Sequence, residues 1–178
     1  MKTMNKKVQT ALDAGFTYAI ELDVTTLEPN AQVREMCAAD KCGAYGKNWT
    51  CPPECGTLEE CTARIRAYTS GILVQTEGEL EDSFDFEGMQ ELNERHQENF
   101  KKAAEALREQ YGEVLCLGSG GCRICKKCAH PEPCRFPEKA CSSMEAYGLL
   151  VSQVCQANGI PYYYGKDTLT YTACYLFK

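Results

Sequence analysis

The stretch Glu113-Val-Leu-Cys-Leu-Gly-Ser-Gly-Gly-Cys-Arg-Ile-Cys-Lys-Lys-Cys128 joins an apolar run to a glycine-rich turn and then to a group of cysteines. Residues 113–117 are rich in residues that favour strands, and the glycines at 118–121 end any regular element. The strand therefore delivers Cys122 to its carboxyl end. Open α/β sheets usually hold their ligands at this end of the strands.

Four cysteines follow the turn with the spacing C-x2-C-x2-C-x5-C, at Cys122, Cys125, Cys128 and Cys134. Such close spacing is typical of ligands to an iron–sulfur cluster, although the bacterial ferredoxin run has three residues before its fourth cysteine and a proline after it. Structural zinc sites usually draw on two separated pairs, with each sulfur about 2.3 Å from the metal. We predict a 4Fe-4S cluster here, with zinc as the first alternative and unligated thiols as the second.

Another group of cysteines lies earlier in the chain, within residues 37–61. Gly43, Gly46 and the Pro52-Pro53 pair predict a loop. The predicted ligands are Cys37, Cys42, Cys51 and Cys55. Cys61 is left out because it shares a helical face with Leu58 and Ile65, which indicates a core position. We expect a second cluster in this block, against a structural zinc or an empty loop. Without Cys55 one iron corner would be open to a substrate.

We call the cysteine group within residues 37–61 the first block and the group from Cys122 to Cys134 the second block. The surroundings of the second block also bear on its chemistry. Residues 118–121 lack the Lys-Ser/Thr of a P-loop, so we expect their backbone N–H groups to donate to cluster sulfurs. Five basic residues lie close by in the sequence: Arg123, Lys126, Lys127, Arg135 and Lys139. Their charge would favour deprotonated cysteine ligands, whereas the alternative interpretation is an ordinary solvated loop.

Composition limits the class of protein. The chain has 178 residues, 44% of them hydrophobic, and 13 cysteines. This length predicts one domain over 1–178, and the odd number of cysteines favours metal ligation over a disulfide framework. The net charge of −6 argues against a nucleic-acid partner. No apolar run is long enough for a membrane span and the first thirty residues lack the pattern of a signal peptide, so we expect a cytoplasmic protein.

The two cysteine blocks together carry a resemblance to a known family. The first reads Cys-x4-Cys-x2-Tyr-Gly-x2-Trp-x-Cys-Pro-Pro at 37–53, and the second reads Cys-x2-Cys-x2-Cys-x5-Cys-Arg-x-Pro with a later Ser-Met-Glu-Ala-Tyr-Gly, ending at residue 148. This order is similar to that of an uncharacterised bacterial and archaeal family of predicted metal-binding proteins. The resemblance implies metal binding by seven cysteines and implies no reaction: Cys37, Cys42, Cys51, Cys122, Cys125, Cys128 and Cys134. Cys55, Cys61 and Cys141 lie outside these motifs.

Strand and helix patterns alternate along the chain. Residues 16–24, 71–76 and 113–117 suit strands, and helices are predicted after Asn30, from a capping box at 57–60, along an apolar face from Met89 to Leu107, and from a second capping box at 142–145. Residues 160–164 and 169–177 read as a final hairpin. The order predicts an α/β domain with a mixed sheet flanked by helices, with both cysteine-rich metal-binding loops on one edge.

Several other residues have two interpretations. His96 is predicted to be a satisfied or half-buried histidine rather than a metal ligand or proton carrier. His130 is predicted to be an exposed loop residue, with a role at the metal site or in proton transfer as the alternative. Cys116, Cys155 and Cys174 read as small core residues. The segment 77–87 carries six acids and no base, which is typical of a solvated loop but could also bind a basic redox partner.

The functional prediction is electron transfer, or redox support of a partner enzyme, by a soluble protein with two 4Fe-4S clusters. One alternative is an iron–sulfur enzyme with an open iron at the first block. The other is a zinc-stabilised interaction module. No metal-free catalytic set is evident in the sequence.

Overall fold

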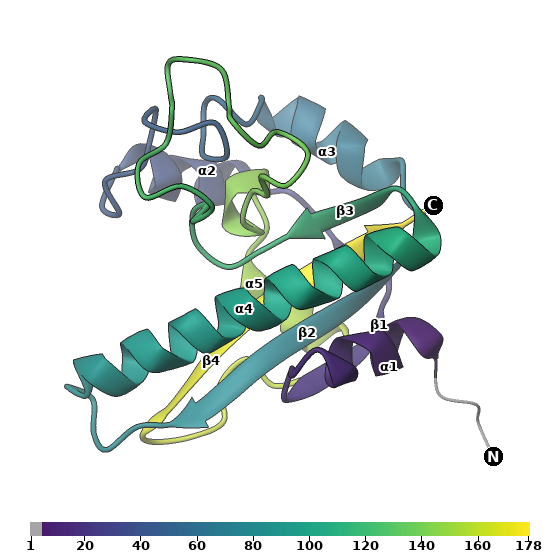
Figure 1. The fold of residues 1–178 in the computed structure, drawn as a ribbon, viewed down its shortest axis with the longest axis vertical. Coiled ribbons are helices and arrows are strands. Elements are labelled where there is room, and N and C mark those ends of the chain that lie inside the picture. The colour runs from purple at the N-terminus through teal and green to yellow at the C-terminus, as the bar shows by residue number, and fades with distance from the viewer. Residues whose placement is uncertain (1–4) are drawn as a thin grey trace.

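In the computed structural model, which describes residues 5–178, four strands form one sheet in the order β1-β2-β4-β3 (Figure 1). The strands are β1 (Tyr18–Leu22), β2 (Ser70–Glu79), β3 (Val114–Leu117) and β4 (Thr168–Phe177). β2 and β4 pair along their whole length, from Ser70 opposite Phe177 to Glu79 opposite Thr168. The second cysteine block follows β3, so it starts from an edge strand.

The predicted single α/β domain is confirmed, but the sheet differs from the prediction in one respect. We predicted a mixed sheet, whereas every hydrogen-bonded pair among these four strands is antiparallel. β2 and β3 both run antiparallel to β4, so they run parallel to each other, as a strand-helix-strand crossover predicts. The last strand inserts between them and pairs with both. The described residues show a parallel bridge between Gly118 and Ser143, outside the strands.

Helices cover both faces of the sheet. The helical elements are α1 (Lys6–Asp13), η1 (Val24–Thr26), α2 (Ala31–Ala38), α3 (Leu58–Arg66), α4 (Phe86–Tyr111), η2 (Glu145–Tyr147) and α5 (Val151–Ala157). Asn30 caps α2 as predicted, and Thr57 and Glu60 form the predicted capping box of α3. α1 is an eight-residue helix capped by Asn5 that was not predicted from the sequence.

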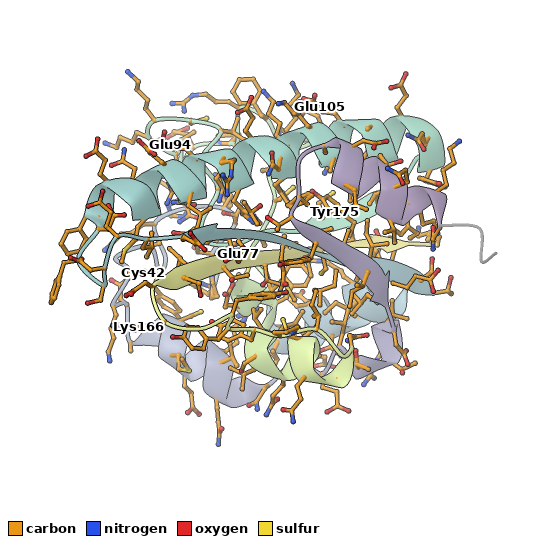
Figure 2. The ribbon with its side chains drawn as sticks, turned by 90° about the horizontal axis from the view of Figure 1, so that it is seen from below. Cys42, Glu77, Glu94, Glu105, Lys166 and Tyr175 are labelled. Carbon is orange, nitrogen blue, oxygen red and sulfur yellow. The ribbon has the colours of Figure 1, made fainter. Side chains whose placement is uncertain are left out.

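The alternation of side chains along the strands builds two cores. Ile72 and Val74 of β2 and Tyr175 of β4 face α1 and α4, where they pack with Phe100. Tyr175 lies between the sheet and α4 (Figure 2), and its hydroxyl donates a 2.8 Å hydrogen bond to the carbonyl oxygen of Phe100. Leu73, between Ile72 and Val74, faces the opposite core beneath α3, η2 and α5. A period of two therefore places apolar residues on both faces.

The predicted final hairpin is wrong in its first half. Residues 160–164 form no strand, whereas β4 is a strand as predicted. Pro161 has no N–H for a strand ladder. Its carbonyl oxygen accepts a 2.8 Å hydrogen bond from Nε2 of Gln75, and Tyr164 Oη donates at 2.6 Å to Gln75 Oε1. A buried glutamine side chain on β2 therefore fixes this segment in place of strand pairing.

The start of the last helix also differs from the prediction. Ser143 Oγ accepts a hydrogen bond from the Ala146 N–H at 3.0 Å, but the turn that follows is the short 3-10 helix η2. Gly148, with a left-handed φ of +79°, ends η2, and α5 begins only at Val151. The apolar residues of the predicted face are buried nonetheless, including Met144 and Val154.

Candidate metal centre

The four cysteines of the second block line one small cavity of about 30 Å³: Cys122, Cys125, Cys128 and Cys134. The loop that carries them runs from the end of β3 to η2 and arches over the sheet edge (Figure 1). All four thiols are free of disulfides. The structure therefore arranges the four predicted ligands around a common space, and a donor set made only of thiols suits iron–sulfur clusters and zinc.

Backbone groups surround the first of these sulfurs. Burial raises the pKa of the Cys122 thiol, and hydrogen bonds from the backbone of Ile124 and Cys141 oppose that rise. The N–H of Cys122 itself donates to Thr50 Oγ1 at 3.4 Å. We expected residues 118–121 to supply the donors, whereas these two come from the residues after Cys122 and from the far end of the loop. Hydrogen bonds of this kind stabilise a thiolate and raise a cluster's reduction potential.

The first block brings three of its cysteines together. Cys37 lies in the last turn of α2, and Cys42 and Cys51 lie in the loop that follows. Burial raises the pKa of Cys37, Arg34 opposes the rise, and the nearby thiolates of Cys42 and Cys51 add to it. Burial also raises the pKa of Cys51. The three thiols therefore lie within electrostatic range of one another.

The two blocks contact each other directly. The Trp49 indole donates a 2.8 Å hydrogen bond from Nε1 to the carbonyl oxygen of Glu132, and its ring lies edge-on to His130, with 4.9 Å between centroids. His130 Nε2 is 3.4 Å from a carboxylate oxygen of Glu54. A Cβ on Gly121 would lie 3.9 Å from the sulfur of Cys51, an ordinary van der Waals distance, so the two loops are neighbours at this point. The predicted adjacency of the two blocks is thus present.

Cys55 occupies a different environment from the other three residues of its block. Its thiol is buried, 3.7 Å from the carbonyl oxygen of Ala146, and Arg34 Nη2 lies 3.7 Å from its sulfur. The same guanidinium nitrogen is 3.2 Å from the sulfur of Cys61. A hydrogen bond from Cys55 and the charge of Arg34 lower the pKa of Cys61 to about 6. Cys61 is a fully buried core residue, as predicted, but it also pairs with Cys55.

Within residues 5–178, no three side chains of His, Cys, Asp or Glu lie close enough together to bind a single metal ion. The ligand roles of the eight cysteines therefore stay predictions. What the structure adds is their placement: four around one cavity, three within electrostatic range of one another, and Cys55 beside Arg34 and Cys61.

Cys116 and Cys141 form a second pair of neighbouring cysteines, which was not predicted from the sequence. Cys141 lies next to Cys116, and Arg108 Nη2 is 3.6 Å from the sulfur of Cys141. A hydrogen bond from Cys116, together with the charge of Arg108, lowers the pKa of Cys141 to about 7. Cys116 is buried as predicted. The one sequence signal was Arg108 at the border of the apolar face of α4, beside Leu107.

The two histidines have distinct outcomes. His130 is more enclosed than the exposed loop residue that we expected, because Trp49 and Glu54 contact it and leave its side chain 15% exposed. His96 is completely buried and hydrogen-bonded through one ring nitrogen, which agrees with the predicted satisfied histidine. Its Nδ1 is 2.8 Å from Thr76 Oγ1, and its Nε2 has no hydrogen-bond partner among the described residues.

Comparison with known proteins agrees with the cysteine pattern. The model of a family described as "Predicted metal-binding protein (DUF2284)" matches residues 20–177. This range includes both cysteine blocks and all four strands, apart from the first two residues of β1. The chain belongs to this family. The resemblance inferred from the two motifs is thereby confirmed, and with it the assignment of this DUF2284 chain to a cysteine-rich family of predicted metal-binding proteins.

No curated protein and no solved structure is significantly similar to this DUF2284 chain. Among its described helices, none combines the length and the apolar character needed to cross a membrane.

Proposed function

We propose that this protein is an iron–sulfur protein with a redox role, whose second block holds a 4Fe-4S cluster on Cys122, Cys125, Cys128 and Cys134. The observation that carries the proposal is the single cavity lined by these four thiols. A bound cluster supplies one-electron transfer. The residues of the chain would tune it, because backbone N–H groups of Ile124 and Cys141 face the Cys122 sulfur.

We propose that the first block holds a second cluster on Cys37, Cys42 and Cys51, with Cys55 as the fourth ligand that the sequence suggests. Burial of Cys37 and Cys51 would keep water from their sulfurs. Trp49 and His130 close the contact between the blocks and would shield both sites. Two sites in contact would allow an electron that enters at one block to leave at the other.

A second candidate function is supported by the contacts of Cys55. Its thiol is engaged with the Ala146 carbonyl, Arg34 and Cys61. If it stays there, the first block has three cysteine ligands and one open position. That position would bind a substrate, and the protein would then be an iron–sulfur enzyme.

The proposed redox partner is a protein with an acidic surface. The acidic segment 77–87 lies at the turn between β2 and α4, away from the cysteine loops (Figure 1). The exposed charged side chains on and beside the second block are mainly basic instead. Against the acids Glu132 and Glu138 stand five bases: Arg123, Lys126, Lys127, Arg135 and Lys139. Charge complementarity close to the electron-carrying residues raises encounter rates. A basic partner is therefore less well supported by the fold than an acidic one.

Metal analysis of anaerobically purified protein tests the proposal. We expect iron and inorganic sulfide in equal amounts, visible absorption from the cluster, and a reduced-state paramagnetic signal. Cys122→Ser should lower the iron content and change that signal. Cys155→Ser is the matched control, because Cys155 is not a predicted ligand and lies in the core beneath α3, η2 and α5. Gln75 and Thr172 offer hydrogen bonds to a hydroxyl at this position. Stoichiometric zinc without iron or sulfide would instead support the zinc-stabilised module.

A further inference from the structure

A large pocket lies against the second block, on the side facing α4. Its volume is about 520 Å³. It is lined by residues of α4 between Gln97 and Arg108 and by the loop after β3. Cys122 lines both this pocket and the small cysteine cavity. Pockets of about 300 to 1,000 Å³ commonly bind small organic ligands.

The walls of the pocket are mainly apolar and rest on the rigid part of the fold. Phe100 stacks on Tyr175 with 5.2 Å between ring centroids, which fixes the floor. A Cβ on Gly118 would come within 3.4 Å of the Phe100 ring, so the glycine leaves that ring accessible from the loop side. Ile124 and Phe136 stand at the mouth with 43% and 40% of their surface exposed. A flat apolar group would bury these surfaces on binding.

Basic side chains surround this apolar floor. The lining contains four bases, Lys101, Arg108, Arg123 and Lys139, and two acids, Glu98 and Glu105. None of the four bases forms a salt bridge within the part of the chain that the structure describes. Glu98, by contrast, is paired with Lys102 at 3.1 Å on the outside of α4. The pocket therefore has an excess of positive charge without carboxylate partners.

Arg108 is the base best placed to fix a ligand. It projects from the last turn of α4, is half-buried, and contacts the sulfur of Cys141 through Nη2. A guanidinium presents a planar set of donors that binds carboxylate or phosphate through two hydrogen bonds. Lys101, two turns earlier on α4, would add a second positive charge.

We propose that this pocket binds a small organic anion with an aromatic or similarly flat apolar body, whose acidic group is held by Arg108 and Lys101 beside Cys122. The ligand site is additional to the proposed redox function and does not depend on which metal the cysteines hold. The bound anion would lie on the side of the second block that faces α4, while the other side of the block contacts the first block.

The test is calorimetric titration of the metal-loaded protein with four probes of similar size: benzoate, phenyl phosphate, benzyl alcohol and benzylamine. We expect one equivalent of an aromatic anion to bind, and the neutral and cationic probes to bind at least about tenfold more weakly. Arg108→Gln should weaken anion binding by about tenfold or more, because it removes charge-assisted hydrogen bonds. Lys101→Gln should weaken it by a smaller factor.

Lys102→Gln is the matched control, since Lys102 is the next residue on α4 and does not line the pocket. It should leave anion binding unchanged, and iron or zinc content should be unchanged in all three variants. The proposal is overturned if no aromatic anion binds, if benzyl alcohol binds as tightly as the anions, or if Lys101→Gln and Lys102→Gln weaken binding equally. Lys101 is exposed, so this last comparison holds even if Arg108→Gln does not fold.

Discussion

Trp49 Nε1 donates a 2.8 Å hydrogen bond to the carbonyl oxygen of Glu132, and this bond joins two loops that are 83 residues apart in the sequence. The first block thereby gains a fixed contact with the second block. Because His130 packs on the same indole ring, the contact combines a hydrogen bond with aromatic packing. The only tryptophan of the chain thus holds the two cysteine blocks together.

Replacing this tryptophan should weaken the contact between the blocks. Trp49→Phe removes the indole N–H and leaves the Glu132 carbonyl to water, so we expect the free energy of unfolding to fall by about 0.5 to 1 kcal/mol. Urea unfolding of the anaerobic protein measures the loss. Tyr162→Phe is a control, because Tyr162 is an exposed aromatic outside both blocks. Equal stability of Trp49→Phe and wild type would show that the bond does not hold the loops.

The fourth ligand of the first block can be identified by substitution. The Cys55 thiol already contacts the Ala146 carbonyl and Arg34, and it hydrogen bonds to Cys61. With Cys55 as the proposed fourth ligand, Cys55→Ser should lower the iron content as Cys42→Ser does, whereas an open first site predicts that Cys55→Ser retains the iron content of the wild type. Iron and sulfide analysis, with the paramagnetic signal of the reduced protein, measures both variants.

Cys61→Ser serves as the partner control for Cys55→Ser, because it alters the same buried pair without touching a predicted ligand. A clear loss of iron in Cys55→Ser alone would establish four cysteine ligands at the first block. Electron transfer would then be favoured over substrate binding at an open iron.

The bases on the second block should control reaction with charged redox reagents. Removing two exposed positive charges in the double variant Lys126→Gln, Lys127→Gln should slow oxidation of the reduced protein by ferricyanide, an anion, by about twofold or more at low salt. The difference should shrink at high salt because of screening. Stopped-flow absorption measures the rate. Lys102→Gln on α4 should have little effect, and a rate independent of Lys126 and Lys127 would argue against docking at this surface.

Local signals were sufficient for most of the elements. Asn30, and Thr57 with Glu60, mark helix starts because each side chain satisfies a backbone N–H within its own turn. The strand at 113–117 was recognisable because its β-forming residues stop abruptly at glycine. Each of these features depends on residues within a few positions, which a single sequence contains.

The differences arise from contacts between distant residues. The place of β4 between β2 and β3 depends on pairing with residues 89 to 107 positions earlier in β2 and 57 to 63 positions earlier in β3, for which no local pattern exists. Residues 160–164 looked like a strand, but Gln75 determines their conformation from another part of the chain. The spacing of the cysteines likewise indicated their chemistry, whereas the pairing of Cys55 with Cys61 and of Cys116 with Cys141 depends on folding.

The buried His96 should make stability fall in mild acid. Burial lowers its pKa from 6.5 to about 4, so the folded protein keeps the ring neutral while the unfolded chain is protonated below about pH 6.5. Because the unfolded state then binds more protons, stability decreases as the pH falls from about 6.5 towards 4. At 1.36 kcal/mol for each pH unit, the full loss is about 3 kcal/mol.

Replacing His96 isolates this effect from other acid-sensitive groups, including any bound metal. His96→Phe keeps an aromatic ring between Phe16 and Tyr171 and removes the titrating group, at the cost of the hydrogen bond to Thr76. We expect the variant to be less stable than wild type at pH 7 and to lose less stability between pH 7 and pH 5. Urea unfolding at both values measures the difference. Parallel pH profiles for the two proteins would mean that His96 is not the residue responsible.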